Sequence, residues 1–209
     1  MLLFGWQPGE KLSLLIKTEI WYNGDVTDGN GFWKVCEALD CEQRIELLRF
    51  LLVGEKTDFP CVMELAERMD LSSATVSVHL KKLAMVGLVM SKRVDRRVYY
   101  RAFATTGEGE KVLAALRVLF KSRPGVERLR KLRDYAHALS HVRRNAIVRC
   151  LHERPGLSLK ELAVETDMPP QTADRLWGEL GKAHIVDLNG VVVPPDGEPE
   201  RSLLDLTLT

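Results

Sequence analysis

The chain has 209 residues, of which 28% are charged and 45% are hydrophobic, and its formal net charge at pH 7 is +1. This composition is that of an ordinary soluble globular protein, with enough chain for one large domain or two small ones. No apolar run approaches the ~20 residues that a membrane-spanning helix needs, so the sequence excludes a helical membrane protein.

The start of the chain and its cysteines favour a cytoplasmic protein. MLLFGWQPGE lacks a basic leader and reaches a proline and a glycine too early for a signal peptide. The four cysteines are too scattered for a disulfide scaffold, which favours a reducing compartment. They are Cys36, Cys41, Cys61 and Cys150. Cys36 and Cys41 could form a redox pair, but buried core positions are the favoured interpretation.

Residues 1–32 form an N-terminal extension whose pattern fits two structures. KLSLLIKTEIWY places apolar residues at alternate positions, as in a strand that could pair with MLLFGW as a β-hairpin, but helical spacing fits as well. We expect four aromatic side chains in or directly after this extension to be core residues rather than a ligand site. They are Trp6, Trp21, Phe32 and Trp33.

Helical signals follow between residues 33 and 87. Apolar residues recur at helical spacing over 33–53, and a short amphipathic helix is predicted over 62–69. Ser72 is a good N-cap for the next helix, because its hydroxyl can accept a bond from a free backbone N–H. Gly87 is a natural helix terminator. One face of the helix between them is apolar: Val76, Leu80, Leu83 and Ala84.

The next segment, LVMSKRVDRRVYYRAF, predicts two strands joined by the polar turn VDRR. Helices followed by a basic hairpin form a winged helix-turn-helix, in which the last helix enters the DNA major groove. Serines capping a surface helix are the simpler alternative, which the arginine-rich hairpin disfavours. The predicted DNA-binding residues are Ser72, Ser73, Thr75, Ser77, Val78, His79, Lys81 and Lys82 on the helix, and Lys92, Arg93, Arg96, Arg97 and Arg101 on the wing.

Three motifs within residues 38–103 resemble the ArsR/SmtB-type (arsenic-repressor) family. They are EALDCEQRIELLRFL, ELAERMDLSSATVSVHLKKLAMVGLV and RRVYYRAF. The resemblance implies a winged-helix transcription factor, usually a homodimeric repressor released from its operator by a small inducer. At Val78 the family often has a long polar or basic residue, so base recognition there is expected to differ.

The metal sites of that family are incomplete in this chain. Its sensors carry Cys-x-Cys-x-x-Cys before the recognition helix, where this sequence has Cys61, Met63 and Ala66. One thiolate cannot supply the converging ligands that a soft metal needs. The family's other site uses Asp and His after the wing, and residues 108–121 contain neither. We therefore expect no metal and no other cofactor.

A second copy of the module is predicted in the C-terminal half. ALSHVRRNAIVRCL resembles the opening motif, with Arg144 aligned to Arg44 at an offset of 100. ELAVETDMPPQTADRLWGELGKAHIV then aligns with residues 64–89 at an offset of 97, with Trp177 replacing Leu80. We expect HIVDLNGVVVPP and the terminal RSLLDLTLT to form the second wing, with PDGEPE as its tip.

The two copies differ sharply in charge. Residues 71–103 hold seven basic residues and one acidic residue, whereas residues 168–200 hold two basic and six acidic residues. Cationic side chains supply most non-specific DNA affinity through phosphate contacts. The second copy is therefore expected to keep the fold without binding DNA.

Helices between the copies are candidates for dimerisation. An apolar seam at helical spacing comprises Leu129, Leu132, Ala136 and Leu139. Either two chains join here as a homodimer, or the copies pack on each other as an intramolecular pseudo-dimer. The two half-site contacts that specific binding usually needs favour the homodimer.

The overall prediction is a mainly α fold with small β wings (α+β), arranged as tandem winged helix-turn-helix domains. Its parts are an extension (1–32), a DNA-binding winged helix (33–105), linker or dimerisation helices (106–135) and a second winged helix (136–209). No phosphate-binding loop or catalytic constellation indicates an enzyme. The predicted function is a DNA-binding transcription regulator, acting as a repressor on double-stranded DNA. The alternative is a tandem winged-helix adaptor that binds proteins, as in some chromosome-segregation factors.

Overall fold

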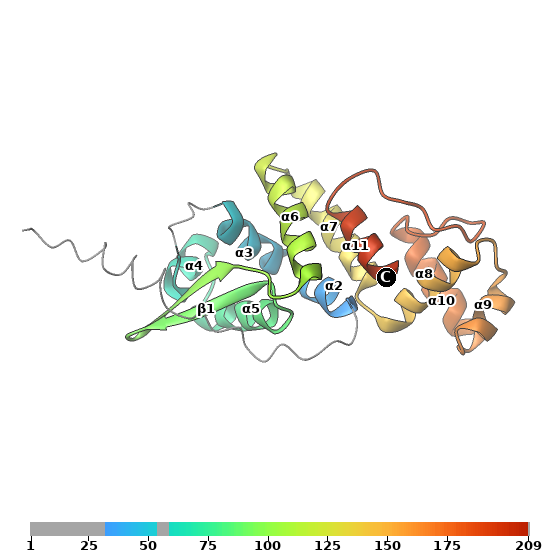
Figure 1. Ribbon diagram of the computed structural model, residues 1–209, viewed down its shortest axis with the longest axis horizontal. Coiled ribbons are helices and arrows are strands. Elements are labelled where there is room, and N and C mark those ends of the chain that lie inside the picture. Colours follow the sequence, from blue (N-terminus) through green and yellow to red (C-terminus); the bar gives the residue numbers. More distant parts are fainter. Residues whose placement is uncertain (1–31, 54–58, 209) are drawn as a thin grey trace, which may run out of the picture.

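The computed structural model describes residues 32–53 and 59–208, which are mainly helical with one small antiparallel sheet (Figure 1). The elements in chain order are α2 (Trp33–Leu39), α3 (Glu42–Val53), α4 (Val62–Met69), α5 (Ser73–Met85), β1 (Val89–Val94), β2 (Arg97–Ala102), α6 (Gly107–Lys121), α7 (Val126–Leu139), α8 (Val142–Glu153), α9 (Leu159–Glu165), α10 (Pro170–Lys182) and α11 (Glu200–Leu208). This mainly α architecture with a small β wing was predicted. The possible N-terminal hairpin lies outside the described residues.

Local signals build the α4–turn–α5 unit. The Ser72 hydroxyl accepts a hydrogen bond from the backbone N–H of Thr75 at 3.1 Å, so the predicted N-cap of α5 is confirmed. Asp70, between the two helices, has a left-handed φ of 52°, and Gly87 after α5 has a φ of 71°. Three residues of α5 are completely buried: Val76, Leu80 and Leu83. One face of α5 therefore packs on the core and leaves the opposite face in solvent.

The hairpin of β1 and β2 lies beside α5. Val89 pairs with Ala102 and Val94 pairs with Arg97, which leaves Asp95 and Arg96 as the turn. Asp95 has a φ of 54°, which a short polar residue tolerates better than a β-branched one. β1 packs on α5, and β2 packs on α3 and α4. The hairpin is thus a short wing attached to the helix-turn-helix unit.

A buried arginine joins two helices in each half of the chain. Arg44 is 7% exposed, and its guanidinium donates a hydrogen bond of 2.9 Å to the backbone carbonyl of Glu37 in α2. Arg144 is 8% exposed, and its guanidinium donates to the backbone carbonyl of His137 in α7. Donor and acceptor are each displaced by 100 positions, the offset of the sequence repeat.

The region around α10 repeats the backbone geometry around α5. Both ends of α10 lie 97 positions after the ends of α5. The N–H of Leu88 donates to the carbonyl of Leu83, and the N–H of Ile185 donates to that of Leu180, each at 3.0 Å. Asp167 has a left-handed φ of 48°, as Asp70 has 97 positions earlier. The two halves therefore share local geometry at the offset that the alignment has.

The prediction that RSLLDLTLT forms the second strand of a second wing was wrong. A single bridge joins Val186 to Val192, and the turn between them contains Leu188, Asn189 and Gly190 rather than PDGEPE. The terminal segment RSLLDLTLT contributes residues 201–208 to helix α11 instead of a strand. Helical spacing prevails because it buries Leu203, which is 0% exposed, against the neighbouring helices.

Four helices in the middle of the molecule join the two halves (Figure 1). α7 packs on α2, and α11 packs on α6 and α7. α2 and α7 each begin one half of the chain, and α6 and α11 each follow the hairpin or bridge of one half. The α2–α7 and α6–α11 contacts therefore join elements at equivalent positions of the two halves. In the predicted seam, Leu132, Ala136 and Leu139 are each 0% exposed within this one chain. The seam is therefore not a free surface for the homodimer that the sequence favoured.

Candidate nucleic-acid interface

The solvent face of α5 carries small, apolar and basic side chains together. Its exposed residues are Ser73, Ala74, Thr75, Ser77, Val78, Lys81, Lys82 and Met85. Val78 is 58% exposed on the face opposite the buried leucines. Small residues allow close approach to base edges, and an apolar side chain such as Val78 can contact a thymine methyl group. Met85, 46% exposed, was missed, although the spacing 74, 78, 81, 85 would have found it.

The hydroxyl groups at the start of α5 form a local pair. The side-chain oxygens of Ser72 and Thr75 lie 2.8 Å apart, and Ser72 also accepts the Thr75 backbone N–H. Both residues are exposed. Ser72 therefore caps the helix, as the simpler interpretation expects. Ser73 and Ser77 are the hydroxyl residues of α5 that take no part in this cap.

His79 does not lie on the open face of α5 as predicted. It is half-buried, and its Nδ1 is buried without a hydrogen-bond partner in the part of the chain that the structure describes. Burial, followed by the nearby cations Arg44 and Lys82, lowers the pKa of His79 below its ordinary 6.5. The side chain lies along the flank of the helix, where its neutral form is favoured.

This placement makes stability depend on His79 at acidic pH. Since the unfolded state binds the proton more readily, the free energy of unfolding should fall as pH drops below about 6.5 and level off below the lower native pKa. His79→Gln should reduce that dependence in urea denaturation measured at several pH values. The exposed His152→Gln serves as the control and should leave it unchanged. An unaltered pH profile in His79→Gln would contradict the burial of this ring.

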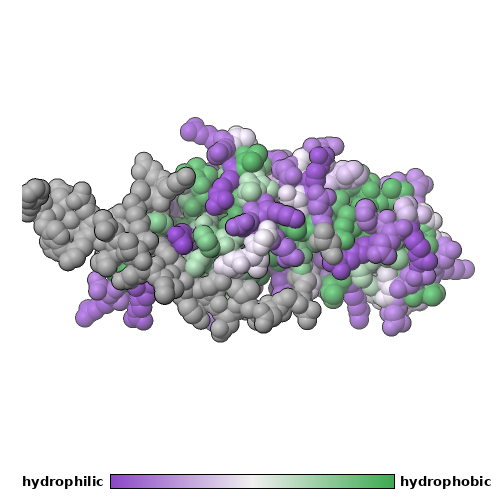
Figure 2. Space-filling view, viewed as in Figure 1, coloured by the Kyte–Doolittle hydropathy of each residue, from purple (hydrophilic) through white to green (hydrophobic). Residues whose placement is uncertain are grey.

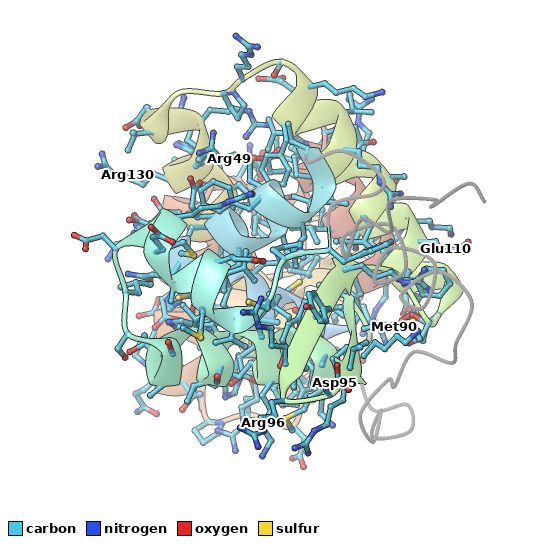
Figure 3. All side chains as sticks on the ribbon, turned by 90° about the vertical axis from the view of Figure 1, so that its left-hand side faces the viewer. Arg49, Met90, Asp95, Arg96, Glu110 and Arg130 are labelled. Carbon is cyan, nitrogen blue, oxygen red and sulfur yellow. The ribbon has the colours of Figure 1, made fainter. Side chains whose placement is uncertain are left out.

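The wing presents three arginines to solvent. Arg93, Arg96 and Arg97 are all exposed, and Nε of Arg93 donates to the backbone carbonyl of Asp95 at 3.3 Å. Hydrophilic side chains gather at the end of the hairpin (Figure 2). Asp95 and Arg96 lie at the lower edge of the molecule, away from Arg49 and Arg130 (Figure 3). The hairpin tip is thus an exposed cationic projection.

Lys92 and Arg101 differ from this prediction. Lys92 is 3% exposed and pairs across the hairpin with Tyr99, which is 5% exposed. The guanidinium of Arg101 lies 4.7 Å from the centre of the Phe103 ring, and burial lowers the pKa of Arg101. Cross-strand neighbours share a face of the hairpin, and this face is covered. Lys92 is therefore not available as an open phosphate contact.

A comparison with protein-family models gives one match, to the bacterial regulatory protein, arsR family, over residues 41–91. The chain contains an arsR-family helix-turn-helix. The match spans α3, α4, α5 and the beginning of β1, so it includes the candidate helix and stops before the wing turn. No curated protein and no solved structure matched the chain. This match supports a DNA-binding transcription regulator.

Outside the arsR-family module, α10 lacks the two lysines that α5 presents. At an offset of 97, Gly178 and Glu179 stand where α5 has Lys81 and Lys82, and Asp174 replaces Ser77. The Glu179 carboxylate accepts a hydrogen bond of 2.7 Å from Arg144 and another from Arg175. The arginine on the solvent side of α10, Arg175, is thereby paired within the helix.

Of the two cysteines within residues 41–91, Cys41 and Cys61, the second has a structural position. Cys61 is 4% exposed and precedes α4, where its backbone N–H donates to the Glu64 carboxylate at 2.8 Å. In the described ranges, no three His, Cys, Asp or Glu side chains are grouped as metal ligands. Those ranges also include no helix with the length and hydropathy of a membrane span.

Proposed function

We propose that this protein represses transcription by binding a specific DNA site with the arsR-family module. α5 enters the major groove with Ser73, Thr75, Ser77 and Val78 towards base edges. Lys81, Lys82 and the exposed wing arginines bind phosphates. The observation that carries the proposal is the coincidence of an open, small-residue helix face with an adjacent cationic hairpin. A protein bound at a promoter excludes polymerase from it.

The C-terminal half is proposed to be a degenerate winged helix that does not bind DNA. Its support is the repeated geometry at Arg144 and around α10, together with the replacement of both lysines. The domains would then be residues 33–105 for DNA, 106–135 as connecting helices and 136–209 as the second module. Residues 168–200, with six acidic and two basic residues, would be repelled by the phosphate backbone.

The two modules are proposed to form a pseudo-dimer within one chain. In its support, α2 packs on α7 and α6 packs on α11, and the α7 seam is buried. Light scattering at micromolar concentration should therefore give the mass of one chain, 23.6 kDa. A stable mass of two chains would contradict this arrangement and restore the homodimer.

A salt titration of binding to random duplex DNA tests the proposed function. Five exposed cations on α5 and the wing should give a slope of log Kobs against log salt of about −4.5 between about 50 and 200 mM salt. Fluorescence anisotropy of a labelled duplex measures it. Binding without salt dependence, or no binding, would contradict DNA recognition by this surface.

The second candidate function is a tandem winged-helix adaptor that binds proteins. The observation that favours it is the acidic excess of residues 168–200, with Asp174 exposed on α10 and Arg175 paired to Glu179. The same titration separates the two functions, because an adaptor does not need a salt-dependent affinity for DNA. Selection of duplexes from a random pool then distinguishes a specific operator from general DNA affinity.

A further inference from the structure

A cavity lies between α2 and the C-terminal end of α5. Its volume is about 290 Å³, and its described lining comprises Lys34, Glu37 and Ala38 from α2, Lys82 and Met85 from α5, and Val86 directly after α5. That volume equals about ten water molecules and lies at the small end of ligand pockets. The cavity lies at the edge of the DNA-binding face described above and shares Lys82 and Met85 with that face.

The lining combines an apolar wall with two cations. Ala38, Met85 and Val86 supply the carbon surface, whereas Lys34 and Lys82 reach it from opposite helices. Lys34 is half-buried, with its Nζ 5.8 Å from the centre of the Trp33 ring. Glu37 is the one carboxylate in the described lining, so the cations exceed it by one. A molecule with an apolar body and one negative group complements this lining.

The position of the cavity connects it to both parts of the molecule. α2 packs on α7, which belongs to the C-terminal half, and α5 carries the residues proposed to enter the groove. A molecule between α2 and α5 therefore touches the recognition helix and a helix that packs on the C-terminal half. Its negative group would also compete with DNA phosphate for Lys82.

We propose that this cavity is a regulatory site for a small amphipathic carboxylate, whose binding weakens DNA binding through Lys82 and α5. The regulatory part rests on the proposed function, whereas the binding part does not. By thermodynamic linkage, the factor by which the carboxylate weakens DNA binding equals the factor by which DNA weakens carboxylate binding. A factor of about five or more is expected.

Octanoate is the probe, because its ten non-hydrogen atoms match the cavity. Isothermal titration calorimetry without DNA should show one submillimolar site per chain. Octanol, which lacks the charge, should bind at least about tenfold more weakly, as expected when a charge-assisted hydrogen bond is absent. No heat with millimolar octanoate, or equal affinity for octanol, would overturn the site.

Two variants locate the site. Lys34→Gln removes a cation that is not among the DNA-binding residues, so it should weaken octanoate about tenfold and leave DNA affinity unchanged. Ala38→Leu fills the apolar end and should also abolish octanoate binding, with folding checked by circular dichroism. If both variants fold and bind octanoate like the wild type, the cavity is not where it binds.

Anisotropy of labelled DNA with and without octanoate tests the regulatory part. Weaker DNA binding by the wild type, and no effect of octanoate on Lys34→Gln, is the expected result. Octanoate binding that leaves DNA affinity unaltered would overturn regulation. A wild type that binds octanoate but shows no DNA affinity would instead overturn the proposed function and leave the ligand site standing, so the two failures are distinguishable.

Discussion

Replacing Arg96 and Arg97 together with alanine should make the salt slope of DNA binding shallower by about 2, because each phosphate that is no longer neutralised reduces the slope by about 0.9. Both side chains are exposed at the hairpin, with Arg96 at its tip, and neither belongs to the buried core. Affinity at about 100 mM salt should fall by roughly tenfold, because fewer counterions are released on binding. Thermal stability should change little, since surface cations contribute little to folding.

The matched control removes the same charge from another part of the surface. Arg130→Ala/Lys131→Ala deletes two exposed cations of α7, and Arg130 lies far from the hairpin tip (Figure 3). A net-charge effect would weaken DNA binding equally in both double variants. A wing contact weakens only the Arg96 and Arg97 variant. Arg175→Ala on α10 should also leave DNA affinity nearly unchanged, and a large loss there would assign DNA binding to the second half.

The helix-turn-helix could be predicted from the sequence because its signals are local. The N-cap at Ser72, the glycine after α5 and the apolar spacing from Val76 to Leu83 each act within a few residues. Such signals operate before any tertiary contact is considered. The family match over 41–91 falls on the same stretch. The wing turn at Asp95 was also predictable from a local signal, the polar segment VDRR.

Features that depend on distant contacts were not predictable. RSLLDLTLT places leucines at both strand and helix spacing, and only packing against the neighbouring helices selects the helix that buries Leu203 and Leu206. Alternation along β1 shows that Lys92 shares a face with Tyr99, but not that this face is covered. The apolar seam of α7 could be predicted from its spacing. That α2 packs on α7 could not, because it depends on the tertiary fold. The spacing of apolar residues predicts which face of a helix or strand is buried, but it does not predict which element packs on that face.

The two buried arginines should be the most costly single positions for stability outside the apolar core. Arg44→Met leaves the carbonyls of Ala38, Glu37 and Asp40 without their donor in a partly buried turn. Unsatisfied buried acceptors cost ~1–3 kcal/mol each before relaxation, so we expect a loss of about 3 kcal/mol in the free energy of unfolding. Urea denaturation followed by circular dichroism measures this, and Tm should fall by roughly 10 °C.

Arg144→Met should have nearly the same effect, because Arg144 fills the equivalent position and also donates to Glu179. Arg49→Met is the control: Arg49 pairs with Glu46 one turn away on α3 with its side chain 39% exposed, so about 1 kcal/mol or less is expected. Since one hydrophobic cluster runs through both halves, each variant should shift a single transition. Two separate transitions, with only one moved by each arginine, would mean that the halves fold independently and that the central helices do not unite them.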